Sequence, residues 1–388
     1  MYPEPTDSIR RLDSAAKIHS DRRLPSLTGL RIFAALAVYL SHIGPPHGSG
    51  ELLSSFIGSG YSGVTLFFVL SGFVLSVNYF DEFRRLRAVT TWNFFVARFA
   101  RIYPLYIVCL AYLVVHQHAL NEPIDGWWRN ALAIQAWSPS VTQAYSFDGP
   151  AWSLSVEFFL YACFPLLVPL IARLHRPRTI LAVAAAVAAA MFALAAIFVA
   201  SGHGSLPMQD PSSAHRWLYR TPLTRLGDFA LGILAARLFV VTRGSPRLAR
   251  VGGPLAAVSA IVFLALMAWP ALYFSAWSWD AAYAVPTVAL IFGLAMAQTG
   301  RLARFLSIPN IVLLGEASFA FYLVHLPMIG FLGAGHWAQD MSPTAALDEI
   351  FIFGAILALA LGLHIGLELP ARRRLRRRLS LRESAAST

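Results

Sequence analysis

Residues 27–44, LTGLRIFAALAVYLSHIG, form an apolar stretch long enough to begin a membrane span, yet they contain Arg31 and His42. An ionisable side chain inside a span costs a few kcal/mol or more, so its presence there indicates a function. Eleven helical residues turn about 20° past three full turns, which places both side chains on one helix face about 16 Å apart. This pair fits a long ligand with a charged end. A snorkelling arginine beside a satisfied buried histidine is the structural alternative.

The composition of the whole chain is that of a membrane protein. Of its 388 residues, 57% are hydrophobic and 13% are charged, whereas soluble domains carry about 25% charged residues. The apolar runs have the length of membrane-crossing helices, and none alternates with the period of a barrel strand. We therefore predict an all-α polytopic membrane protein with about ten transmembrane helices. The predicted spans are 27–44, 60–79, 102–119, 151–172, 179–200, 222–241, 254–272, 283–299, 310–330 and 348–369.

The positive charges set the orientation of these spans. The net charge is +11, and with the N-terminus in the cytoplasm all but four of the 31 Lys and Arg residues lie on or near the inner side. This asymmetry follows the positive-inside rule, so both termini are predicted to be cytoplasmic and nucleic acid is not an expected partner. We expect a cytoplasmic tail at 1–26, a membrane domain at 27–370 and a basic tail at 371–388. The four exceptions are Arg129, Arg216, Arg220 and Arg225.

Two sequence features argue against other classes of protein. The first 26 residues lack the apolar core of a signal peptide, so the first span is expected to be an uncleaved anchor. Cys109 and Cys163 both fall inside predicted spans. They form neither a disulfide framework nor a metal-ligand cluster, and no metal site is expected.

Arg98 and Arg101 stand at the inner boundary of the third predicted span, in VARFARIYPLYIV. Residues three apart lie on one face of a helix. Two guanidinium groups at that spacing can bind phosphate oxygens through paired hydrogen bonds. They can equally be two anchors that follow the positive-inside rule.

Glu157, about two turns inside the fourth span, lies at a depth similar to that of His42. A buried carboxylate beside an imidazole orients its tautomer and stabilises the imidazolium form. An internal ion pair between Glu157 and Arg225 is the alternative. Arg225 and Asp228, three residues apart, are expected to pair with each other, and His325 is the third ionisable group in the outer half.

The longest outer loop, 120–150, is rich in aromatic side chains and includes Asp125 and Asp148. Such a surface can hold a sugar ring, and it can also be an aromatic belt at the membrane interface.

Five motifs in the same order resemble those of the acyltransferase-3 family of membrane O-acyltransferases. They are Arg31 followed by ten residues and His42, LFFVLSGF at 66–73, Arg98-x-x-Arg101, WSLSVE at 152–157 and SFAFYLVH at 318–325. The resemblance covers about residues 25–372. It implies a stand-alone member that modifies a surface polysaccharide, a lipid-linked glycan or a glycosylated metabolite. The LPSLTGLR opening is also similar to that of members that acylate macrolide antibiotics.

The resemblance implies an acyl-CoA donor, with acetyl-CoA expected as a co-substrate that is not permanently bound, and a carbohydrate acceptor. It assigns the cytoplasmic phosphate end of the donor to Arg98 and Arg101, with Arg31 as a further contact. His42 becomes the general base and Glu157 the residue that orients it. An acyl-His intermediate passed across the membrane is an open alternative. Substrate contacts or structural support are expected from Ser71, Trp152, Ser155, Arg225, Asp228, Tyr322 and His325.

The function predicted from the sequence is therefore an O-acyltransferase of the cell inner membrane. The alternative from another class is a transporter that exports a lipid-linked or acylated saccharide. Transporters often contain inverted repeats, and no internal repeat is visible in this sequence.

Overall fold

The protein is described by a computed structural model that covers residues 24–339 and 342–381. Within these ranges every regular element is a helix and no strand occurs, so the all-α prediction is confirmed. The long helices are α2 (Pro25–Ile43), α4 (Gly63–Tyr79), α5 (Ala88–Ala119), α8 (Trp152–Ala172), α9 (Pro177–Ala200), α10 (Pro222–Thr242), α11 (Pro246–Ala268), α12 (Ala281–Met296), α14 (Pro309–Leu332) and α15 (Pro343–Leu363). The shorter helices are α3 (Glu51–Gly58), α6 (Trp127–Ala131), α7 (Val141–Ala144), α13 (Arg301–Leu306) and α16 (Leu369–Leu379).

Each of the ten predicted spans coincides with one of these long helices. Eight helical segments of the described chain are long and apolar enough to cross a membrane. The other two predicted spans correspond to α10 and α12. Helix α10 carries the charged residues Arg225, Asp228 and Arg237, and α12 is only 16 residues long. The chain is thus a polytopic membrane protein.

Several helices extend beyond the segments predicted from the sequence. Helix α5 begins at Ala88 rather than at 102, because the basic segment before the apolar run buries Phe94 and Ala97 and continues the helix. The predicted outer loop 45–59 contains α3. The basic tail expected from residue 371 is helical to Leu379. The N-terminal tail, predicted at 1–26, lies outside the described residues up to position 23, and α2 begins at Pro25.

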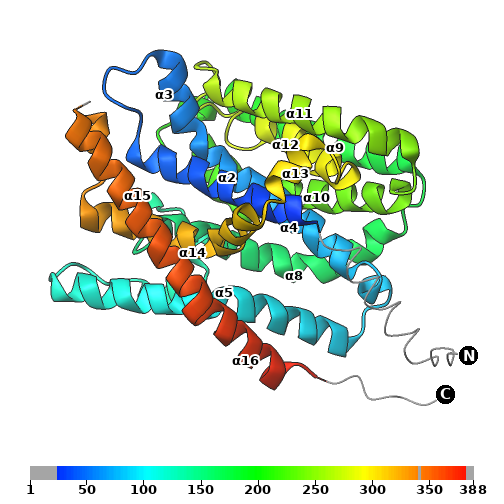
Figure 1. Cartoon of the computed structure of the whole chain (residues 1–388), viewed down its shortest axis with the longest axis horizontal. Coiled ribbons are helices and arrows are strands. Elements are labelled where there is room, and N and C mark those ends of the chain that lie inside the picture. Colours follow the sequence, from blue (N-terminus) through cyan, green and yellow to red (C-terminus); the bar gives the residue numbers. More distant parts are fainter. Residues whose placement is uncertain (1–23, 340–341, 382–388) are drawn as a thin grey trace, which may run out of the picture.

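Two close helix pairs build the centre of the molecule: α2 packs against α14, and α4 packs against α10 (Figure 1). A Cβ atom added at Gly72 of α4 would stand 2.3 Å from the carbonyl oxygen of Phe229, and one at Gly232 of α10 would stand 2.1 Å from that of Val69. Only glycine allows these backbones to approach so closely. The α2–α14 contact brings the segment that contains His42 beside the segment that contains His325.

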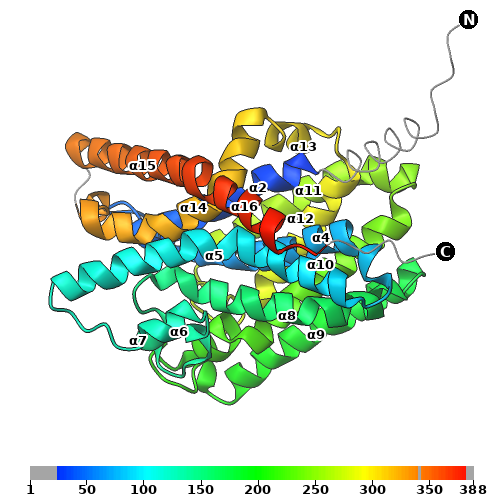
Figure 2. The same ribbon diagram turned by 90° about the horizontal axis from the view of Figure 1, so that it is seen from below.

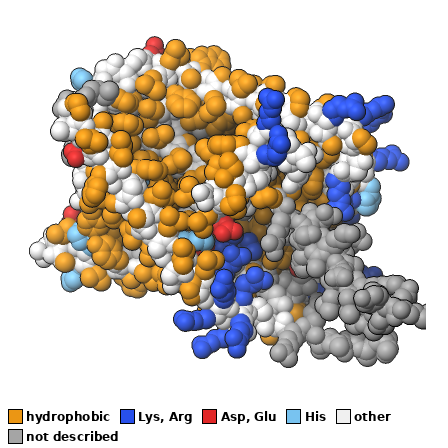
Figure 3. Space-filling view, in the orientation of Figure 1, with side chains coloured by type: hydrophobic (Ala, Val, Ile, Leu, Met, Phe, Trp, Pro, Cys, Tyr) orange, Lys and Arg blue, Asp and Glu red, His pale blue; other side chains and the backbone are white. Residues whose placement is uncertain are grey.

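Helices α5 and α16 form the remaining wall beside this centre. In Figure 2, α16 lies across α5, and the two helices are in contact. On the face shown in Figure 3, Lys and Arg side chains gather in the half of the molecule where α16 ends, and the opposite end shows none. The sequence predicts that this side of the molecule is cytoplasmic.

Candidate active site

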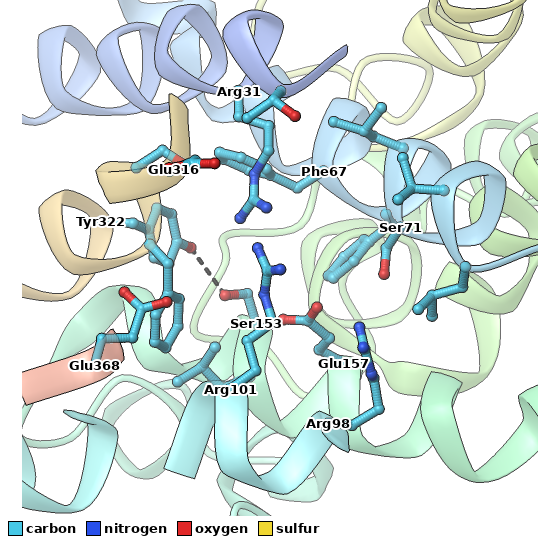
Figure 4. A pocket seen from close by; sticks show the side chains of 18 of the residues that line it. Arg31, Phe67, Ser71, Arg98, Arg101, Ser153, Glu157, Glu316, Tyr322 and Glu368 are labelled. Carbon is cyan, nitrogen blue, oxygen red and sulfur yellow. Dashed lines mark hydrogen bonds between the residues drawn. The ribbon is translucent and has the colours of Figure 1, made fainter. Parts of the chain in front are cut away.

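A cavity of about 320 Å³ lies between α2, α4, α5, α8, α14 and the junction of α15 with α16. It contains all three arginines that the sequence predicted for a phosphate end, together with a fourth that it did not single out. Figure 4 shows Arg31 of α2 approaching Arg98 and Arg101 of α5. The arginine, glutamate and histidine residues that line the cavity are Arg31, Arg98, Arg101, Arg372, Glu157, Glu316, Glu368 and His364.

The three predicted arginines face one another across this cavity. Arg31 extends from α2 toward Arg101, which extends from α5 on the opposite wall (Figure 4). The Arg98 guanidinium lies 5.8 Å from the ring centres of Tyr79 and Phe94, and its Nε is buried without a hydrogen-bond partner. In the described part of the chain, no ion pair joins any of the three to a carboxylate. The four arginines of the cavity outnumber its three glutamates, and these three arginines have no ion-pair partner, so the cavity is suited to an anion.

Glu157 belongs to the arginine cavity rather than to the histidines. Its carboxylate accepts a hydrogen bond from the hydroxyl of Tyr161, one turn along α8. Figure 4 places it beside Arg98 and Arg101. The predicted contact between Glu157 and His42 is not formed. Depth along the membrane gives only one coordinate, and two residues at the same depth can face different neighbours.

His42 is partnered instead by His325. The two rings lie 5.0 Å apart between centres, and Nε2 of His325 is 3.2 Å from Nδ1 of His42. Nδ1 of His42 donates to the carbonyl of Val38 at 2.9 Å, and Nδ1 of His325 donates to the carbonyl of Tyr322 at 2.7 Å. Both rings are therefore protonated on Nδ1, since a carbonyl oxygen only accepts. In the neutral ring of His42 this leaves the lone pair on Nε2.

Tyr322 connects the histidines to the arginine cavity. Its side chain lines the cavity, while its backbone carbonyl binds His325. Its hydroxyl lies 3.0 Å from Oγ of Ser153 and donates to the carbonyl of Pro150 at 3.1 Å (Figure 4). The arginines and the histidine pair therefore occupy adjoining regions that share one residue.

Three other predicted residues have simpler surroundings. Ser71 lines the cavity. Trp152 is buried, with its ring centre 4.8 Å from that of Tyr219. Ser155 accepts a hydrogen bond from the backbone N–H of Ala136 at 3.4 Å and so ties α8 to the segment 120–150.

Arg225 and Asp228 form the predicted ion pair, with 2.9 Å between Nη1 and Oδ2. Asp280, which the sequence analysis did not identify, adds a second carboxylate at 3.0 Å. Arg225 is fully buried and also donates to the carbonyls of Tyr219 and Trp279. The Arg225 group thus joins α10 to the segment before α12 and lies outside the cavity, and Glu157 is not its partner.

A further buried histidine, His215, lies in the segment between α9 and α10. Nε2 of His215 lies 3.2 Å from the hydroxyl oxygen of Tyr145. Burial, with the nearby charges of Arg220 and Arg225, lowers the pKa of His215 to about 3. It is therefore neutral at physiological pH and cannot account for titration near neutrality. The aromatic loop exposes three indole rings, those of Trp127, Trp128 and Trp137. Their exposure is compatible with a sugar-binding surface and with an aromatic belt at the membrane interface.

No metal site is evident among the described residues, in which no three His, Cys, Asp or Glu side chains are grouped suitably. The site residues that sequence reasoning missed include Arg372, Glu316, His364, Glu368 and Ser153. Ser153 lies within the WSLSVE motif, and Arg372 was one of seven C-terminal arginines with nothing to distinguish it.

Comparison with known proteins extends these observations. A family model described as an acyltransferase domain matches residues 24–367. Acyltransferase MdmB of Streptomyces mycarofaciens is 36% identical over 326 residues, which cover 79% of this chain and 79% of MdmB. O-acetyltransferase OatA of Staphylococcus aureus is 23% identical over 374 residues, which cover 91% of this chain but 58% of OatA. No solved structure matches the chain.

Proposed function

Because the chain belongs to the acyltransferase-3 family, we propose that it transfers an acyl group, with acetyl expected, from acyl-CoA to a carbohydrate hydroxyl. The names of its relatives support acyl transfer, and that of OatA supports an oxygen acceptor. The acceptor class comprises a surface polysaccharide, a lipid-linked glycan or a glycosylated metabolite. The expected location is the inner (plasma) membrane, with the bilayer as its surroundings.

The observation that carries the proposal is the cavity with its unpaired arginines. Coenzyme A is a long molecule with phosphates at one end and a thioester at the other. Guanidinium groups bind phosphate through charge-assisted, often bidentate hydrogen bonds. Arg31, Arg98 and Arg101 lie on the side expected to be cytoplasmic, where acyl-CoA is available. In this proposal they hold the phosphates, and the pantetheine arm extends past Tyr322 toward His42.

The histidine pair supplies the chemistry. His42 Nε2 accepts the proton of the acceptor hydroxyl as the hydroxyl oxygen attacks the thioester carbonyl. An ester C–O bond forms, the C–S bond breaks, and the departing thiolate of coenzyme A takes the proton back from the imidazolium. His325 positions the His42 ring. The N–H at Nδ1 of His42 donates both to the carbonyl of Val38 and to Nε2 of His325. An acyl-His42 intermediate would use the same nitrogen as a nucleophile, so the geometry is compatible with both routes.

Acyl transfer can be tested with purified full-length protein, radiolabelled acetyl-CoA and a panel of acceptors that includes a macrolide glycoside and a soluble oligosaccharide. The proposal predicts labelled acceptor and stoichiometric release of free CoA. Absence of CoA binding would contradict the donor assignment. Saccharide movement across vesicles without CoA release would favour a transporter.

A further inference from the structure

The C-terminal end of the membrane domain forms part of the arginine cavity. After α15 the chain makes a π-helical turn at His364–Glu368 and continues as α16. Five arginines on α16 are exposed, whereas Arg372 is only partly exposed and lines the cavity. Its position therefore distinguishes it from the rest of the basic run. The exposed five are Arg373, Arg374, Arg376, Arg377 and Arg378.

The structure fixes this segment at both ends. In the π-helical turn, Nδ1 of His364 lies 2.8 Å from the carboxylate of Glu368, and both side chains line the cavity. At the other end, Trp92 of α5 donates its indole N–H to the carbonyl of Leu379 at 2.8 Å. The backbone N–H of Leu381 donates to the side chain of Asn93 at 2.7 Å. Helix α16 is thus attached to α5, the helix that carries Arg98 and Arg101.

Arg372 is a fourth cation in a cavity that already contains three unpaired arginines. No ion pair or hydrogen bond engages its guanidinium within residues 24–339 and 342–381. Four arginines and three glutamates line the cavity, so its charge balance is positive and attracts an anion. Coenzyme A carries a diphosphate and a separate phosphate on the 3′ position of its ribose, which is the part of the molecule farthest from the thioester.

The positions of the arginines suggest how these phosphates are divided. Arg98 and Arg101 lie on α5 just before the predicted start of the third span at 102, and Arg31 faces them from α2, inside the first predicted span. Arg372 stands beyond the last span, on a helix whose other arginines are exposed. We propose that Arg372 binds the 3′-phosphate of the donor at the cytoplasmic mouth of the cavity, and that Arg31, Arg98 and Arg101 bind the diphosphate. This inference rests on the proposed acyl-CoA donor.

The test compares the affinity of the purified full-length protein for coenzyme A and for 3′-dephospho-coenzyme A. Wild type is expected to prefer coenzyme A by about 10- to 150-fold, the usual effect of a charge-assisted contact. Arg372→Ala should lose that preference and retain the wild-type affinity for the dephospho form. Arg372→Lys should retain part of it, and Arg373→Ala, an exposed neighbour on the same helix, should retain all of it.

Each other outcome would overturn the inference. Equal affinity of wild type for the two ligands would show that the 3′-phosphate is not recognised, even if Arg372→Ala fails to fold. If folded Arg372→Ala protein loses affinity equally for both ligands, Arg372 contacts the diphosphate or has only a structural role. If wild type binds neither ligand, the acyl-CoA donor itself is wrong and the inference falls with it. If wild type prefers coenzyme A but Arg372→Ala keeps that preference, only the inference is wrong.

Discussion

Nε2 of His325 lies 3.2 Å from Nδ1 of His42, and the two residues come from helices at opposite ends of the sequence. His325 is fully buried and is itself oriented by the carbonyl of Tyr322. The close packing of α2 on α14 makes this contact possible, because a Cβ added at Gly315 would stand 2.0 Å from the carbonyl oxygen of Thr28. In the proposed mechanism, His325 is a positioning residue that keeps the lone pair of His42 on Nε2.

His325→Ala should lower kcat by up to about 10²-fold while the KM for acyl-CoA stays near that of wild type, because a misplaced base impairs the chemical step and not donor binding. Steady-state kinetics on folded protein provide the measurement. His325→Gln, which retains an acceptor near Nδ1 of His42, should recover part of the rate. A purely structural role would lower the yield of folded protein without this separation of kcat from KM.

Arg98→Ala and Arg101→Ala should each raise the Kd for acyl-CoA by about 10- to 150-fold, because each removes a charge-assisted contact with phosphate. The KM for the acceptor should change little. Arg250→Ala is a suitable control, since Arg250 is exposed on the same expected side and does not line the cavity. Unchanged donor affinity in both variants would make these arginines topological anchors only.

Arg225→Ala should reduce the stability of the protein strongly, because it leaves the buried carboxylates of Asp228 and Asp280 without their cation. Removing one partner from a buried ion pair typically costs about 3–5 kcal/mol. Thermal unfolding in detergent measures the loss, and Arg216→Ala, a partly exposed arginine nearby, is the control. Lowered donor affinity at unchanged stability would show instead that Arg225 acts on the ligand.

Cysteine labelling of intact cells tests the orientation on which the donor side depends. In a background without Cys109 and Cys163, Gly48→Cys and Gln209→Cys should react with an impermeant reagent from outside. Ala88→Cys and Arg247→Cys should react only after the membrane is opened. All four positions are exposed in the structure, so accessibility reports the side of the membrane. Labelling of position 88 from outside would reverse the topology.

The sequence predicted those parts of the structure that depend on one helix at a time. Apolar length located the ten helices. The three-residue spacings predicted that Arg98 and Arg101 share a face and that Arg225 and Asp228 form an ion pair. These relationships follow from helix geometry alone.

Relationships between helices were predicted less well. Glu157 was predicted to contact His42 because both lie at a similar depth. In the structure, Glu157 lies beside the arginines, and His325 is the residue that contacts His42. Arg372 was missed for a related reason. Six arginines of α16 look alike in sequence, and only the docking of that helix on α5 shows which one reaches the cavity.

The central claim is that His42 acts as the general base, and its most direct test is the kcat of His42→Ala per folded, CoA-binding molecule. The account predicts a loss of about 10²- to 10⁴-fold, the usual contribution of a positioned base, with donor affinity retained. In wild type the rate should also fall at acid pH, because only the neutral imidazole accepts a proton. Near-normal turnover by the molecules of His42→Ala that fold and bind CoA would contradict the claim.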